Sequence, residues 1–168
     1  ELALLAHKIE HEELGHQSGV QDQVAAAFGG ICLIEMLMGQ FPEFNWSQLL
    51  YLPDLMQQIE SGLLLVSTGE KRSSGVEHEK QLAIIQAGGP EAEEALQHII
   101  AMANAAKQVA DRLEHGDWPG VCAAFGDNWK HQVALDPTAE TDAIKFITRV
   151  AEHKGATVKV GGAAGGGV

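Results

Sequence analysis

The chain has 168 residues, of which 45% are apolar and 20% are charged, and only two are cysteines. This composition is typical of one or two small globular domains and excludes disordered, collagen-like and disulfide-dense secreted proteins. With 11 basic and 23 acidic residues, the formal net charge of −12 disfavours nucleic acids and anionic membranes as partners. No apolar run approaches the ~20 residues of a membrane-spanning helix, so we expect a cytoplasmic protein.

The first part of the chain predicts short helices alternating with strands. In chain order, we expect helices over 1–14 and 21–30, strands over 31–38 and 45–52, and a turn or short helix over 53–59. The clearest predicted strand is 62–68, a continuous apolar run that Gly69 closes.

The second part of the chain reads as helical. Apolar stripes at helical spacing predict four helices, over 75–87, 90–115, 118–129 and 138–153. A short β-prone segment, 156–160, then runs into a glycine-rich end. The fold class is therefore α+β, with a boundary near residue 60 where strand-rich sequence gives way to helices.

Both ends of the sequence look like internal points of a longer protein. Apolar residues at helical spacing begin at Leu2 with no capping residue and no initiating Met before them. At the other end the chain stops in a glycine run, which normally connects two elements. We therefore expect the chain to be a fragment.

The motif His7-Lys8-Ile9-Glu10-His11 could carry metal chemistry. Two histidines one helical turn apart, with a carboxylate beside the second, match the H-x-x-E-H pattern of inverted zinc peptidases. The other interpretation is a solvated helix face, because helices rich in His and Glu produce this short pattern by chance. No downstream acid stands out as a third zinc ligand.

A glycine turn over 15–19 delivers Asp22 to the expected N-terminus of a short helix. One interpretation is an Asp that caps the free backbone N–H groups of that helix. The other is a functional carboxylate, because Gln21 and Gln23 flank it and small residues follow, which suits a helix packed closely under a ligand.

The closing glycine run could bind an anion through its backbone N–H groups. Gly162, Gly165 and Gly166 are the candidate residues for such a phosphate contact. The run lacks the spacing of the dinucleotide-binding and Walker motifs, and a frayed tail is the alternative.

Taken in order, four segments resemble a known family. They are 1–30, 63–74, 116–147 and 155–167, which contain "GHQSGVQDQVAAAFGG", "LLLVSTGEKRSS", "GDWPGVCAAFGDNWKHQVALDPTAETDAIKFI" and "GATVKVGGAAGGG". This ordered set resembles the GHMP small-molecule kinases, and within them the kinases of D-glycero-D-manno-heptose 7-phosphate, with the kinase half of fucokinase nearby. The family's first motif, its Gly/Ser-rich phosphate loop and the elements that follow its last glycine motif are not in this sequence. The glycine motif, "GGAAGGG" here, also departs from the family's Gly-Ala-Gly.

The resemblance implies a partial N-terminal domain over 1–60 and a truncated C-terminal kinase domain over 61–168. It gives Asp22 the position of the family's catalytic aspartate and Glu10 that of an acid that helps to hold Mg²⁺. Gly19, in the turn before Asp22, is predicted to contact the substrate. The cofactors implied are ATP and Mg²⁺, and the ionised Asp22 would orient the acceptor hydroxyl and receive its proton.

A basic segment lies at 67–74, at the end of the clearest predicted strand. Lys71, Arg72, Ser73 and Ser74 place two cations and two hydroxyl groups together in an acidic chain. A solvated loop with capping serines is one interpretation. The other is a pocket for the distal phosphate of a sugar phosphate, since Arg presents a planar pair of donors.

The sequence thus predicts an ATP-dependent sugar kinase that phosphorylates the anomeric hydroxyl of a phosphorylated heptose. A fucose- or galactose-type kinase, a zinc hydrolase and a non-catalytic binding module are the alternatives. The partner expected is a small sugar or sugar phosphate. The chain by itself is expected to be inactive and to dimerise through apolar surface that the missing segments would cover.

Overall fold

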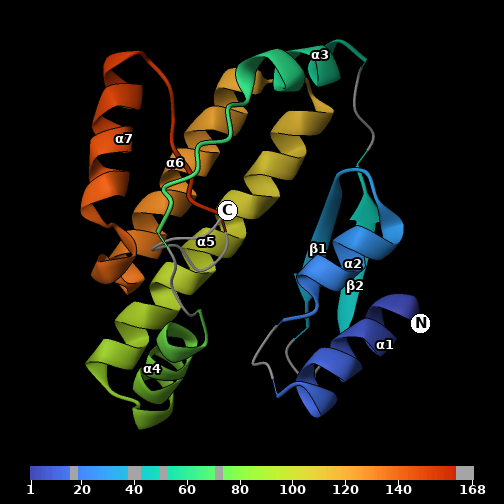
Figure 1. Ribbon diagram of the computed structural model, residues 1–168, viewed down its shortest axis with the longest axis vertical. Coiled ribbons are helices and arrows are strands. Elements are labelled where there is room, and N and C mark those ends of the chain that lie inside the picture. The colour runs from blue at the N-terminus through green and yellow to red at the C-terminus, as the bar shows by residue number, and fades with distance from the viewer. Residues whose placement is uncertain (16–18, 38–42, 50–52, 71–73, 162–168) are drawn as a thin grey trace. The chain divides into compact units, whose positions relative to one another are not determined.

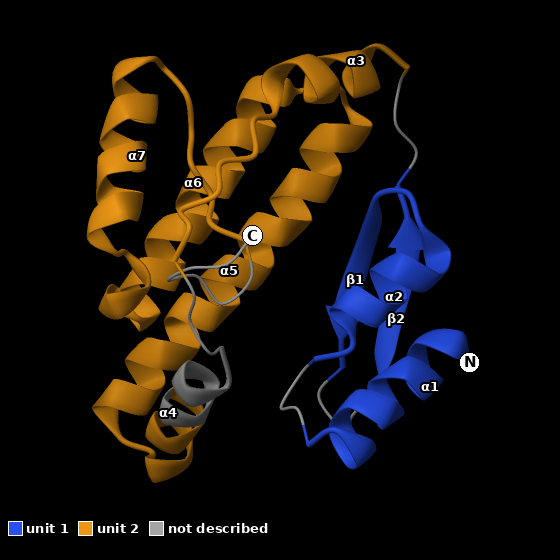
Figure 2. Ribbon diagram, viewed as in Figure 1, with its two compact units in different colours: residues 1–50 blue, residues 51–168 orange. Residues whose placement is uncertain are grey.

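The structure, a computed structural model, describes residues 1–15, 19–37, 43–49, 53–70 and 74–161, with backbone alone over 74–80 (Figure 1). The chain divides into two compact units, Glu1–Leu50 and Tyr51–Val168 (Figure 2). Helices dominate the described residues, which also contain one two-stranded sheet, in agreement with the predicted α+β class. The domain boundary predicted near residue 60 from the change to helical sequence stays a prediction.

The first unit contains two short helical segments and a hairpin. Its elements are α1 (Leu2–Lys8), the π-helical segment η1 (Ile9–Glu13), α2 (Gln21–Phe28), β1 (Cys32–Met36) and β2 (Phe44–Gln48). The helices and strands predicted over 1–14, 21–30, 31–38 and 45–52 are therefore present with shifted ends. The shift is largest for the second strand, which begins one residue before the predicted start and ends at Gln48 rather than at residue 52.

Packing in the first unit fixes α1, α2 and the sheet together. Ala3 of α1 and Val20 and Val24 around α2 form a buried cluster, and Ile34 and Phe44 of the two strands pack against it. The strands are antiparallel, with Cys32 opposite Gln48 and Met36 opposite Phe44 in the register. The apolar faces of α1 and α2 thus share one small core with the hairpin, which holds the two helices side by side.

A glycine turn joins α2 to β1. Gly30 has a φ of +69°, a backbone conformation that residues with a side chain rarely adopt. A Cβ atom at this position would also lie only 2.6 Å from Nε2 of Gln48 on β2. The positive φ therefore favours glycine at the reversal after α2, whereas the flexible end of the Gln48 side chain could move aside for a Cβ atom.

The second unit is a set of packed helices. In chain order they are α3 (Pro53–Gly62), α4 (Ser74–Ala87), α5 (Pro90–Glu114), α6 (Trp118–Leu135), the 3-10 turn η2 (Pro137–Ala139) and α7 (Asp142–His153). The long helices α5 and α6 form an antiparallel hairpin, and α4 packs beside α5 (Figure 1). Trp129, Ala139 and Ile144 form a buried cluster that joins α6, η2 and α7, with Val133 and Val160 packed against it.

The strand predicted over 62–68 is wrong. Gly62 ends α3, and the residues that follow have no regular secondary structure. Leu64 and Leu65 are 82% and 89% exposed rather than buried. A strand forms only where a neighbour accepts and donates its backbone hydrogen bonds, and none of the described residues pairs with this segment. The apolar composition of 62–68 indicates that this segment can form a strand. Whether it does so depends on pairing with a strand elsewhere in the chain, which the local sequence does not encode.

Asp117 caps α6, and removing its side chain tests how much the cap contributes. Its Oδ1 accepts a hydrogen bond from the backbone N–H of Gly120 at 3.0 Å, and its Oδ2 accepts one from Arg112 at 3.1 Å. We expect Asp117→Ala to lower the free energy of unfolding by about 1 kcal/mol, because the N-cap bond is lost. Urea unfolding measures the change. The matched control is Asp111→Ala, which removes an exposed acid of α5 that caps nothing, and it should change stability by less than about 0.5 kcal/mol. Equal effects of the two substitutions would contradict the capping role.

Among the helices that the structure describes, none is both long enough and apolar enough to cross a membrane.

Candidate functional site

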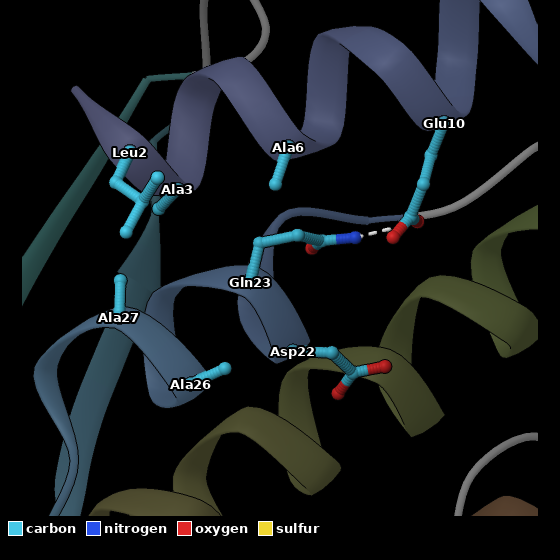
Figure 3. A pocket seen from close by; sticks show the side chains of 8 residues that line it. All are labelled: Leu2, Ala3, Ala6, Glu10, Asp22, Gln23, Ala26 and Ala27. Atoms are coloured by element: carbon cyan, nitrogen blue, oxygen red, sulfur yellow. Dashed lines mark hydrogen bonds between the residues drawn. The ribbon is translucent and has the colours of Figure 1, made fainter.

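A pocket of about 370 Å³ lies in the first unit between α1 and α2 (Figure 3). Side chains of both helices and of η1 line it: Leu2, Ala3, Ala6, Glu10, Asp22, Gln23, Ala26 and Ala27. The apolar residues lie toward the start of α1, and the three polar side chains gather toward η1 (Figure 3). An apolar wall with a few convergent polar groups is the usual construction of a small-molecule site.

Asp22 lies in the first turn of α2, with its carboxylate at the polar end of the pocket (Figure 3). The N-cap of α2 is Val20, and no side chain makes a capping hydrogen bond there. The interpretation of Asp22 as a capping residue is therefore wrong. Asp22 lies two residues after the N-cap, and its side chain makes no capping hydrogen bond to the free N–H groups. Its charge still faces the positive end of the helix dipole, which favours a carboxylate at this place.

Glu10 reaches the same pocket from η1. Its Oε2 atom accepts a hydrogen bond of 2.6 Å from Nε2 of Gln23, which follows Asp22 on α2. The structure thus brings together three polar residues from two elements, two of which the sequence had singled out. The sequence pattern places Gln23 beside Asp22 but does not indicate its contact with Glu10.

The backbone of η1 helps to aim Glu10 at the pocket. The N–H of Leu14 donates to the carbonyl of Ile9 at 3.1 Å, a bond that spans five residues instead of the four of an α-helix. This wider turn changes the direction of the side chains relative to those of α1. Since π-helical turns are frequent at functional sites, the local geometry agrees with a role for Glu10.

The residues in this pocket are suited to a Mg²⁺ ion that also binds phosphates. Mg²⁺ usually takes one or two protein carboxylates, and water and substrate phosphate oxygens complete its coordination. Glu10 of η1 and Asp22 of α2 supply two carboxylates that line the pocket. The described residues contain no group of three or more His, Cys, Asp and Glu side chains that could form a cage made by the protein alone. Such a cage is not needed for a metal that arrives with a nucleotide.

The zinc pattern of His7, Glu10 and His11 lacks a third protein ligand in the described part of the chain. His7 is only 4% exposed and its ring stacks on that of His11, with 5.7 Å between the ring centres. The carboxylate of Glu10 accepts a hydrogen bond from Gln23. This arrangement favours histidines that pack the helix over a zinc hydrolase.

The loop predicted to bind a substrate phosphate lies only partly within the described residues. Lys71, Arg72 and Ser73 are outside them, and Ser74 begins α4 with its side chain outside them. The start of the loop is described: Gly69 turns the backbone with a φ of +71°. Glu70 then accepts a hydrogen bond of 2.7 Å from the hydroxyl of Thr141, the N-cap of α7. The phosphate-binding role of this loop stays a prediction.

The glycine candidates divide in the same way. Gly19 is half-buried and directly precedes Val20, the N-cap of α2, while Gly162, Gly165 and Gly166 lie outside the described residues. Just before the glycine run, Lys159 donates hydrogen bonds to Oε1 of Gln132 at 2.8 Å and to the carbonyl of Val160. Burial lowers the pKa of this lysine below its ordinary value. The segment that leads into the glycines is therefore anchored to α6.

A search of curated proteins finds a distant relative. The chain is 26% identical, over an alignment of 174 positions, to D-glycero-alpha-D-manno-heptose 7-phosphate kinase of Campylobacter jejuni. The alignment covers 99% of this chain and 48% of the relative, so the chain spans about half the length of the curated protein it matches. No protein-family model matches the chain, and no solved structure matches it. By its name, this relative is a kinase that acts on a heptose phosphate.

Proposed function

We propose that this chain contributes the catalytic aspartate, Asp22, and a metal-binding glutamate, Glu10, to an ATP-dependent sugar kinase. The reaction transfers the γ-phosphoryl group of ATP to the anomeric hydroxyl of a phosphorylated heptose. One observation supports the proposal most directly: Glu10 and Asp22, 12 positions apart in the sequence, line the same pocket. The kinase activity of the distant relative supports the choice of reaction.

Asp22 would act on the acceptor. Its ionised carboxylate orients the sugar hydroxyl by accepting a hydrogen bond, and it takes the hydroxyl proton as the oxygen bonds to phosphorus. Phosphoryl transfer depends mainly on positioning and on neutralising charge, so the mechanism makes little demand for a strong base.

Glu10 would hold the metal. Bound Mg²⁺ supplies neutralisation of the charge on the ATP phosphates. The Glu10 carboxylate is a hard oxygen ligand of the kind that Mg²⁺ prefers, and its hydrogen bond to Gln23 keeps it at the edge of the pocket.

The test of this function uses the purified full-length protein with ATP, Mg²⁺ and one of three sugars. We expect ADP release with D-glycero-D-manno-heptose 7-phosphate, and the product should carry a new phosphate at the anomeric position by ³¹P NMR. Fucose and galactose are the comparison sugars, and a higher kcat/KM for either would replace the heptose as substrate. ADP release with none of the three would contradict the proposal.

Replacing Glu10 tests its metal role. We expect Glu10→Gln to raise the Mg²⁺ concentration for half-maximal activity by at least about tenfold. Loss of an outer-shell partner already costs a metal site about this much, and the loss of a ligand should cost no less. A Mg²⁺ titration at fixed ATP measures it. The control is Glu13→Gln, which removes an exposed acid of the same π-helical segment and should leave the titration unchanged. An unchanged curve for Glu10→Gln would remove this residue from the metal site.

A further inference from the structure

Gln23 is buried at the polar end of the pocket in a way that simple packing does not explain. Its side chain is 9% exposed, although the adjacent Asp22 on the same turn of α2 is exposed. The amide Nε2 donates a 2.6 Å hydrogen bond to Glu10 across 13 positions of sequence (Figure 3). The other end of the amide, Oε1, is buried and has no hydrogen-bond partner among the described residues.

This half-satisfied amide carries an energetic cost. A buried polar atom without a partner loses its hydration and gains nothing in return. An apolar side chain of the same length, such as Met, would fill the space without that cost. A glutamine is therefore best explained by its bond to Glu10, which outweighs the unsatisfied carbonyl.

The direction of the bond has a chemical consequence for Glu10. The amide N–H₂ group donates and the carboxylate accepts, so the bond fixes the position of one oxygen of Glu10. A carboxylate offers about four acceptor positions, and Gln23 uses one of them. Outer partners of this kind orient the carboxylates that bind metals in proteins. The buried position of Gln23 in α2 makes it a rigid support for a ligand that projects from η1.

We propose that Gln23 is a positioning residue that holds the Glu10 carboxylate oriented to bind the divalent metal of the nucleotide complex. The inference rests on the proposed kinase function and adds to it a residue to which the comparisons give no role. Asp22 and Gln23 then divide the start of α2 between them, with Asp22 facing the acceptor and Gln23 supporting the metal ligand.

The primary variant is Gln23→Met, which keeps the length and burial of the side chain and removes the donor. In the full-length protein with ADP present, we expect Mn²⁺ to bind about tenfold more weakly, measured by the electron paramagnetic resonance signal of free Mn²⁺. The Mg²⁺ concentration for half-maximal activity should rise by a similar factor, and the KM for the sugar should stay within about twofold of wild type. A residue that only packs the helix would leave the metal titrations unchanged.

Two comparisons separate positioning from general damage. Gln21→Met changes the exposed glutamine on the other side of Asp22 and should leave Mn²⁺ binding unchanged. In a double-mutant cycle, Gln23→Met should add little to the loss of Mn²⁺ affinity caused by Glu10→Gln, because the two residues act through one interaction. Full additivity would show that Gln23 does not act through Glu10. If Gln23→Met does not fold, Gln23→Asn, whose amide is one methylene too short to reach Glu10, carries the same expectations.

The outcomes distinguish this inference from the proposed function. Unchanged Mn²⁺ binding by Gln23→Met in an active kinase overturns the role of Gln23 and leaves the kinase standing. If the wild type binds Mn²⁺ with ADP but phosphorylates none of the three sugars, the reaction is wrong, and weaker Mn²⁺ binding by Gln23→Met still supports the positioning role. If the wild type does neither, both proposals are overturned.

Discussion

Asp22→Asn is expected to lower kcat of the full-length protein by at least ~100-fold, with little change in the affinity for ATP. The asparagine keeps the size of the side chain but can neither accept the proton of the sugar hydroxyl nor present a full negative charge to it. Losses of this size are typical of removing a group that takes part in acid–base chemistry and positions the acceptor. Steady-state kinetics with saturating sugar and ATP measure the effect.

The chain offers a closely matched control for this substitution. Asp54 is the second residue of α3, as Asp22 is the second residue of α2, and both are exposed acids in the first turn of a helix. Asp54→Asn therefore removes the same favourable interaction with a helix dipole and leaves the pocket intact. Wild-type turnover by Asp22→Asn, or an equal loss in both variants, would remove Asp22 from the mechanism.

Arg72→Ala is expected to raise the KM for the phosphorylated sugar by roughly 10- to 150-fold and to leave the KM for ATP nearly unchanged. The range corresponds to the loss of a hydrogen bond to a charged group, about 1.5 to 3 kcal/mol. An arginine can bind two oxygens of a phosphate at once, which an alanine cannot replace. Directly before this segment, Gly69 turns the backbone and Glu70 is bound to the N-cap of α7.

Substrate pairs make the assignment of Arg72 testable. The ratio of KM values for a phosphorylated sugar and for the same sugar without its phosphate should fall in Arg72→Ala. Arg149→Ala removes an exposed arginine of α7 and should change neither KM. If Arg72→Ala weakens both sugars equally, or weakens ATP alone, the distal phosphate is not bound here and an unphosphorylated sugar becomes the better substrate.

The helices of the second unit could be predicted from sequence because their signals are local. Pro90 at the first position of α5, Thr141 at the N-cap of α7 and apolar residues at three- and four-residue spacing all act within one or two turns. The start of α2 at Gln21 belongs to the same class, so Asp22 could be placed at a helix N-terminus without knowledge of the fold. Such features need no distant partner, and the sequence by itself determines them.

Only the tertiary structure decided which of these residues meet. Glu10 stands among several acids of its segment, and it is selected because the π-helical turn and the packing of α1 on α2 bring it to Gln23. The apolar run over 62–68 failed as a strand for the same reason, since strand formation depends on a neighbour distant in sequence. Periodicity reports what one segment prefers; contacts between segments depend on loop closure and shared burial, which single-sequence patterns do not encode.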